Sequence, residues 1–167
     1  EYSPLKIPGK NAFSAIRLDL DGLQRLYEYD LKTGDSSPIT NLKIGYHVWV
    51  NKDLLVATVL MENRMDLVVI NLKDNSHFTV QKNVGRSLHK IPGSNRISYI
   101  DKSKKHWEIK SMDPVSGSTN SVAKTFENEE DVCWLDENTL ITGHEKSLLT
   151  FDVKNGVDWE PLMTFNL

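Results

Sequence analysis

The chain has 167 residues, of which 39% are hydrophobic and 26% charged, and its formal net charge at pH 7 is -3. This balance is typical of a globular chain and excludes a disordered tail, which would carry fewer apolar residues and more net charge. The sequence lacks the basic footprint of a nucleic-acid-binding protein and any run of 18 apolar residues that could span a membrane. Cys133 is the only cysteine, so an intramolecular disulfide is excluded.

Short apolar runs separated by turn residues recur along the whole chain. Runs that we read as strands end at Asp30, Asn71, Asp113 and Asp152, in steps of 41, 42 and 39 residues, and each is followed by a turn containing Gly or Asn. Only four alanines occur, although Ala is the best helix former. The pattern therefore predicts an all-β chain with very little helix, built as a sandwich, barrel or propeller.

A second match defines the repeat more sharply. Residues 7–16 read IPGKNAFSAI and residues 91–100 read IPGSNRISYI, at an offset of 84 residues, which is two periods. Residues 49–55 and 134–140 form a second pair, and both begin with Trp. We therefore expect four units, at residues 1–42, 43–84, 85–127 and 128–167.

Each unit is expected to contain four short antiparallel strands. The second unit would hold strands at 46–50, 54–60, 65–72 and 76–80, and the third at 87–91, 96–100, 107–112 and 119–124. Four strands in about 40 residues is the size of one propeller blade. The prediction is thus an all-β propeller of four-stranded antiparallel blades in a single domain or part of one. A sandwich with similar hairpins is the alternative, but it does not explain a ten-residue match at two periods.

The unit resembles the TolB-like β-propeller repeat. The hairpin turns at 7–10, 50–53, 91–94 and 135–138 are degenerate forms of that family's Ser-Pro-Asp-Gly turn, and the strands that follow match its apolar strand. The Gly-His and Trp-Asp signature of WD repeats is absent. The resemblance implies an extracytoplasmic, mostly bacterial setting and partner binding rather than catalysis. Because such propellers usually have six blades, we expect the four units to be consecutive blades of a longer protein.

The sequence contains no phosphate-binding loop, dinucleotide glycine pattern, nucleophile elbow or zincin motif. The leading interpretation is therefore a non-enzymatic binding module of the bacterial cell envelope, periplasmic and without a cofactor, whose partner is a protein or a small ligand. One alternative is a metal-assisted lyase or hydrolase with its site at the channel mouth. The other is the gating propeller of a prolyl-oligopeptidase-like peptidase, with catalysis on a segment outside this chain.

First strands line the central channel of a propeller, so their leading ends are the candidate ligand site. The candidates are Tyr46, His47, Arg86, His89 and Asp131. His47 and His89 are 42 residues apart, which predicts equivalent places in adjacent units, matched by Leu5 and Cys133.

Imidazole and thiolate are ligands for transition metals, so His47, His89 and Cys133 are candidate ligands of a divalent metal. The structural alternative is two buried, neutral histidines bonded to backbone groups, and the large apolar neighbours Trp49 and Ile91 favour it.

The sequence also predicts how three features pack. Cys133 lies between Val132 and Trp134 on an inner strand and is expected to be buried and unreactive. Trp49 and Trp134 are expected to pack between blades, with sugar stacking as the alternative. The outer faces of the first and fourth blades are expected to be apolar and to promote self-association if the ring is open.

Overall fold

The computed structural model describes residues 1–166, which form sixteen β-strands and no helix. The strands make four separate four-stranded antiparallel sheets, and within each sheet every strand pairs with the next along the chain. This architecture confirms the predicted all-β fold of repeated four-stranded blades. A search of the described residues finds no helix long and apolar enough to cross a membrane.

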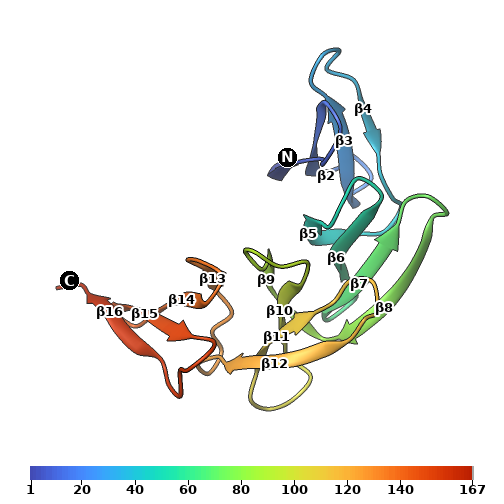
Figure 1. Cartoon of the computed structure of the whole chain (residues 1–167). Coiled ribbons are helices and arrows are strands. Elements are labelled where there is room, and N and C mark those ends of the chain that lie inside the picture. Colours follow the sequence, from blue (N-terminus) through green and yellow to red (C-terminus); the bar gives the residue numbers. More distant parts are fainter. Residues whose placement is uncertain (167) are drawn as a thin grey trace. The chain divides into compact units, whose positions relative to one another are not determined.

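The strands follow one another in the same order in every sheet (Figure 1). The first sheet contains β1 (Tyr2–Lys6), β2 (Ala12–Leu18), β3 (Gln24–Asp30) and β4 (Ser36–Pro38). The second contains β5 (Ile44–Trp49), β6 (Leu54–Leu60), β7 (Met65–Asn71) and β8 (Ser76–Lys82). The third contains β9 (Val84–Lys90), β10 (Ile97–Asp101), β11 (Glu108–Met112) and β12 (Thr119–Lys124). The fourth contains β13 (Val132–Trp134), β14 (Thr139–His144), β15 (Ser147–Asp152) and β16 (Glu160–Thr164).

The chain divides into two compact units, Glu1–Val84 and Gly85–Leu167. The first unit holds the first two sheets, and the second unit holds the last two apart from the first residue of β9. In the first unit, alternate residues of facing strands form one apolar core, which includes the fully buried Ile16 and Leu26 of the first sheet and Leu55 and Ala57 of the second. In the second unit the corresponding core joins residues of the last two sheets. Its buried members are Ile100, Ile109, Ala123, Val132 and Leu140.

The same hydrogen bond joins the two sheets of each unit. The indole N–H of Trp49 donates to Ser14 Oγ at 2.8 Å in the first unit, and the indole N–H of Trp134 donates to Ser98 Oγ at 2.8 Å in the second. Trp49 belongs to the core of its unit, and Trp134 packs against the core of the other. The prediction that both tryptophans pack between blades is confirmed.

The hairpin that follows the first strand differs in length between sheets. The bond that closes it spans five residues from Ile7 N–H to Ala12 O, and likewise from Ile91 to Arg96 in the third sheet. It spans only four residues from Val50 to Leu54 in the second sheet, and the fourth sheet has the same short form. The first and third sheets therefore carry one extra residue in this loop.

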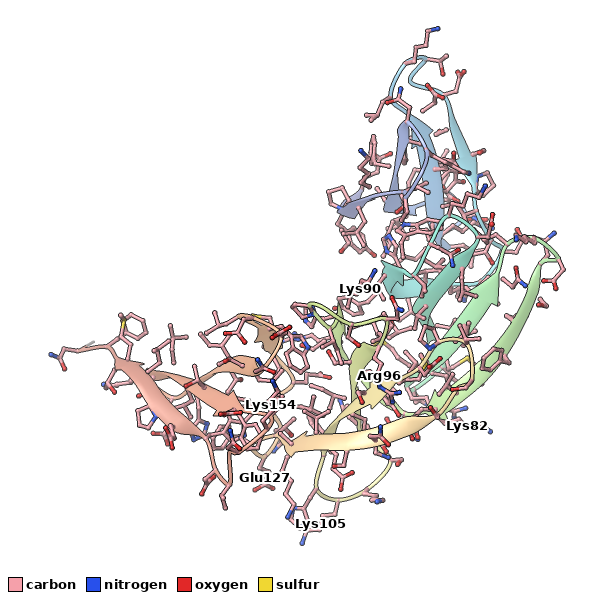
Figure 2. The ribbon with its side chains drawn as sticks, in the orientation of Figure 1. Lys82, Lys90, Arg96, Lys105, Glu127 and Lys154 are labelled. Carbon is pink, nitrogen blue, oxygen red and sulfur yellow. The ribbon has the colours of Figure 1, made fainter. Side chains whose placement is uncertain are left out.

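The extra loop residue corrects the predicted equivalence of the two histidines. Counted from the closing bond, His89 matches Val48, whereas His47 matches Leu88. Lys90, labelled in Figure 2, ends β9 at the place where Trp49 ends β5. Because a shift of one residue turns a strand side chain to the other face of its sheet, His47 and His89 point to opposite faces of their own sheets. The prediction that they occupy equivalent places is wrong.

Cys133 does match His89 and Leu5, but it is exposed, so the prediction that it is buried is wrong. On β13 the neighbours Val132 and Trp134 point to the face that packs in the core. Strand alternation therefore directs Cys133 to the opposite face, where it pairs with Ile141 of β14.

The outer faces of the first and fourth sheets differ in chemistry. On the fourth sheet, cross-strand pairing places Cys133, Ile141, Leu148 and Met163 on the face opposite the core, and Met163 is 53% exposed. Thr150 and Glu160 lie on the same face, in register with Ile141, so the prediction of an apolar face holds only in part. Whether this face promotes self-association stays a prediction.

The corresponding face of the first sheet is not purely apolar, and the prediction is wrong there. Phe13 stacks on Tyr29 with ring centroids 4.9 Å apart, and the guanidinium of Arg17 lies 3.5 Å from the ring centroid of Tyr27. Asp19 accepts hydrogen bonds from Arg17 at 2.8 Å and from Tyr27 at 2.9 Å. The Arg17–Asp19 ion pair thus covers the ring of Tyr27, because a cation can lie on a π face and still bind a carboxylate.

Candidate functional site

A pocket of about 400 Å³ opens in the second unit, bounded by β9 and by the face of β13–β15 that points away from the core. Its lining residues are Ser87, His89, Asp131, Val132, Cys133, Ile141, Thr142, Gly143 and Leu148. Three of them, His89, Asp131 and Cys133, are residues that the sequence singled out as binding or metal-ligating candidates. A fourth candidate, Arg86, reaches the pocket by its contact with Asp131.

Arg86 and Asp131 form a bidentate ion pair at the rim. Arg86 Nε donates to Asp131 Oδ1 at 2.6 Å, and Nη2 donates to Oδ2 of the same carboxylate. The two side chains are 50% and 70% exposed, so the pair contributes little to the free energy of unfolding. Its consequence is geometric, because the fork of the guanidinium fixes the orientation of the carboxylate.

Ser87 ties β9 to the segment that leads into β13. Its hydroxyl donates to the carbonyl of Glu130 and accepts the backbone N–H of Val132 at 3.0 Å. The Glu130 side chain returns to β9, where its Oε2 accepts the backbone N–H of Arg86 at 3.0 Å. These bonds hold the two walls of the pocket together.

Glycine at position 85 permits this close approach. A Cβ there would lie 2.4 Å from Glu130 Oε2 and 3.0 Å from Ile100 Cβ. The contact with Glu130 is shorter than real Cβ contacts and the one with Ile100 is tighter than most, so any larger residue would push the Glu130 side chain away from β9.

His89 is half-buried in the wall of the pocket. Burial lowers the pKa of its imidazole, and a backbone hydrogen bond with Val132 raises that pKa in part. Burial therefore favours the neutral form of the His89 imidazole.

His47 lies in the core of the first unit and is only 5% exposed. Its Nε2 is 2.8 Å from Ser14 Oγ, which also accepts the indole N–H of Trp49 and lies 3.2 Å from the carbonyl oxygen of Leu5. Ser14 donates its single hydroxyl hydrogen to the Leu5 carbonyl, so its oxygen can only accept from His47. We therefore assign the ring hydrogen of His47 to Nε2. Nδ1 is buried without a hydrogen-bond partner among the described residues, and burial lowers the pKa of the ring to about 4.

Tyr46, the remaining candidate, is half-buried on β5, and its backbone N–H donates to Thr58 Oγ1 at 2.9 Å. It lies in the first unit with His47, whereas Arg86, His89 and Asp131 lie in the second. One ligand or ion shared by His47 and His89 stays a prediction. Among the described residues, no group of three or more His, Cys, Asp or Glu side chains is placed to hold a metal ion.

A second pocket of about 460 Å³ lies at the hairpin ends of the same two sheets, and its lining includes Trp134, Arg96 and Lys154. Figure 2 labels the two cations. Arg96 is already bound, because its Nη2 donates to the carbonyls of Ser111 and Ser118 at 3.1 Å each. This pocket is therefore a weaker candidate for a ligand site than the first.

No family model matches the sequence, and no curated protein matches it. Solved structures do resemble the chain, at low sequence identity. TolB from Acinetobacter baumannii is 13% identical, with a TM-score of 0.69, over 90% of this chain and 40% of that one. An oligogalacturonate lyase in complex with manganese is 16% identical, with a TM-score of 0.70, over 92% of this chain and 50% of that one.

The β-propeller domain of the Trilobed protease from Pyrococcus furiosus is 10% identical, with a TM-score of 0.66, over 98% of this chain and 57% of that one. The chain has a TolB-like propeller fold. It spans between 40% and 57% of the length of these three structures.

Several residues of the first pocket, between β9 and β13–β15, were not predicted from the sequence. Ile141, Thr142 and Leu148 come from β14 and β15, whereas the predicted candidates all lie on the first strands or at their entries. The signal that could have found them is the alternation of β14. Leu140 and Thr142 are buried on this strand, so Ile141 must point to the other face, beside Cys133.

Proposed function

We propose that this propeller chain is a non-enzymatic binding module that takes a segment of a partner protein, or a small ligand, into the pocket between β9 and β13–β15. The observation that carries the proposal is the gathering of His89, Asp131 and Cys133 around one pocket, with Arg86 at its rim. A volume of about 400 Å³ is within the range of small-molecule sites, which combine apolar walls with a few polar groups.

Binding fits the polar groups of the pocket better than catalysis does. The hydroxyls of Ser87 and Thr142 donate to backbone carbonyls, and the imidazole of His89 is bonded to the backbone of Val132. Catalytic nucleophiles are instead paired with a side-chain base that activates them. The geometry therefore supports a site that holds a ligand without transforming it.

The metal-assisted alternative draws on the likeness to a lyase in complex with manganese. Because the described residues offer no cluster of three metal-ligating side chains, they do not fit such a centre. The peptidase alternative draws on the likeness to a protease propeller, which is a likeness of fold. We place the module in the periplasm of a bacterium on the resemblance to TolB, and the partner in the same compartment.

Selection of peptides against the native protein tests the proposal, with Cys133 as the reporter. Random peptides are selected on the unmodified chain, and their affinities are measured before and after a bulky maleimide is attached to Cys133. We expect affinity to fall at least tenfold on modification, because the adduct fills the pocket. The variant Cys133→Ser, treated with the same reagent, should keep its affinity. Unchanged affinity after labelling would show that the peptides bind elsewhere and would overturn the proposal.

A further inference from the structure

The first unit has a pocket of its own, of about 440 Å³, between the β4–β5 connection and the hairpin of β7 and β8. We call it the β8 pocket. Its aliphatic lining includes Ile70 of the core and the side chains of Ile39, Leu42 and Leu72, which pack against that core. None of the described residues that line it is an Asp, Glu, Lys or Arg. A charged ligand group would lose its hydration there without gaining an ion partner, so the pocket favours a neutral ligand.

Polar side chains of the β8 pocket are available to a ligand. Asn41, Asn75 and His77 line the pocket and are exposed, and their side chains make no hydrogen bond to another described residue. An Asn amide both donates and accepts, as a peptide group does. The combination of aliphatic side chains with free amides therefore suits a peptide.

β8 is the outermost strand of the second sheet, so one of its edges has no neighbouring strand among residues 1–166 (Figure 1). The backbone bond from Leu72 N–H to Asp53 O identifies which residues of β7 bond to β6. Bonded and non-bonded pairs alternate along an antiparallel ladder. His77 and Thr79 pair with β7 residues that bond to β6, so their own N–H and C=O groups point away from β7 to the open edge.

The other three outermost strands are less open to pairing. β4 is only three residues long and ends at Pro38, and β16 contains Pro161. The carbonyl of Lys124, at the end of β12, accepts the indole N–H of Trp159 at 2.9 Å. Short strands, proline and covering side chains prevent pairing at sheet edges. β8 has seven residues and no proline, and a bulge confines its regular stretch to 76–79, beside the β8 pocket.

We propose that β8 and its pocket bind an extended, uncharged segment of a partner protein, which adds antiparallel to β8 as a fifth strand of the second sheet. Free N–H and C=O groups at strand spacing are complementary to another extended backbone. A segment residue that pairs with His77 has its side chain on the same face as His77, which is the face of the pocket. Main-chain bonds give such a site its affinity, and an aliphatic side chain in the pocket gives its specificity. This site is additional to the function proposed above, because it lies in the first unit.

Three heptapeptides with acetylated and amidated ends test this proposal on the intact chain. The first probe is Ac-Ser-Thr-Thr-Leu-Thr-Thr-Ser-NH₂, and the other two carry Glu or Lys in place of Leu. Binding is followed by the amide resonances of His77 and Leu42 in ¹⁵N-labelled protein. We expect the Leu probe to bind at least tenfold more tightly than either charged probe, because the pocket lining offers no ion partner.

Methylation of the peptide nitrogens separates strand addition from binding of the side chain alone. The central Leu must direct its N–H to β8 when it pairs with His77, and so must every second residue of the probe. Methyl groups on the second, fourth and sixth nitrogens should therefore weaken binding at least tenfold. Methyl groups on the third and fifth nitrogens lie on the other edge and should leave affinity within about threefold of the parent probe.

The variant His77→Glu places a carboxylate at the pocket. It should weaken binding of the Leu probe at least fivefold and strengthen binding of the Lys probe, because an aliphatic group next to a carboxylate cannot replace its water. The matched control is His106→Glu, at an exposed histidine of the second unit, which should bind both probes as the parent does. The comparison of probes on the parent chain decides the question even if His77→Glu fails to fold.

The proposal is overturned if a charged probe binds as tightly as the Leu probe, if the probe methylated at its second, fourth and sixth nitrogens keeps its affinity, or if no probe shifts these resonances. Shifts of the same resonances that grow with the concentration of the chain alone would assign the edge of β8 to a second copy of the chain. That result would also contradict a site for a partner segment.

Discussion

Trp49 Nε1 lies 2.8 Å from Ser14 Oγ, and this one hydroxyl connects three strands of the first unit. It also meets His47 Nε2 at 2.8 Å and the carbonyl oxygen of Leu5 at 3.2 Å. The equivalent Ser98 of the second unit binds Trp134 and the carbonyl of His89, but no histidine ring. The two units thus share a joint between sheets that is more deeply buried, and carries one more partner, in the first.

Removing this hydroxyl should destabilise the first unit more than the second. Ser14→Ala leaves the buried N–H groups of Trp49 and His47 without an acceptor, and unsatisfied buried groups cost about 1–3 kcal/mol each. We expect the free energy of unfolding to fall by about 2–4 kcal/mol, measured by urea denaturation. Ser98→Ala, the matched change, should cost about 1 kcal/mol, because Trp134 is only half-buried. Equal losses would contradict the assigned network.

Acid should weaken the first unit through His47. Its pKa is lowered by burial from 6.5 to about 4 in the folded chain, so the unfolded chain binds more protons between these values. Stability should therefore decline as the pH falls from 6.5 towards 4, by on the order of 3 kcal/mol in total. Urea denaturation at pH 7 and pH 4.5 measures the decline.

The control for this pH effect is His47→Gln, whose amide N–H can still reach Ser14 but does not titrate. The difference in stability between the two pH values should shrink in the variant. The remaining decline includes the contribution of His89, whose pKa is also lowered by burial. An undiminished decline in His47→Gln would show that His47 is not the titrating group.

The thiol of Cys133 should react readily in the native protein, because it is exposed on the fourth sheet. We expect labelling by a chromogenic disulfide reagent to proceed in the folded chain within about tenfold of its rate in urea, since access rather than unfolding limits it. If the thiol were labelled only as fast as the chain unfolds, Cys133 would be buried in the native protein, and the exposed position described above would be contradicted.

Gly85→Ala should destabilise the wall of the pocket, by about 1–3 kcal/mol, because its Cβ would meet Glu130 Oε2 and Ile100 Cβ. Gly143→Ala is the matched change in the same unit, where nothing lies within 4 Å of the added Cβ. It should leave the free energy of unfolding within about 0.5 kcal/mol of the parent value. Similar losses for both variants would refute the close approach of Glu130 to β9.

The repeat in the sequence predicted the architecture well. The strands β6 and β12 begin and end where the pattern placed them, and the paired tryptophans pack between sheets. These features depend on periodic apolar residues and turn residues, which are local signals. The prediction of four-stranded propeller blades followed from them, and the resemblance of the repeat to the TolB-like family supplied the rest.

The sequence did not predict which residues share a face at the first strands. An average period of about 42 residues hides a difference of one residue in the hairpin loops, and one residue is enough to reverse every side chain of a strand. His47 was therefore matched with His89, and Cys133 was expected in the core. The pocket residues of β14 and β15 depend on pairing between strands, which the candidate search did not consider.

The central claim is that the pocket between β9 and β13–β15 is a binding site. A crystal structure of the chain with the tightest peptide from the selection tests it most directly. The account predicts the peptide in this pocket, with an aliphatic side chain against Ile141 and Leu148. A peptide bound elsewhere on the chain, with the pocket unoccupied, would contradict it.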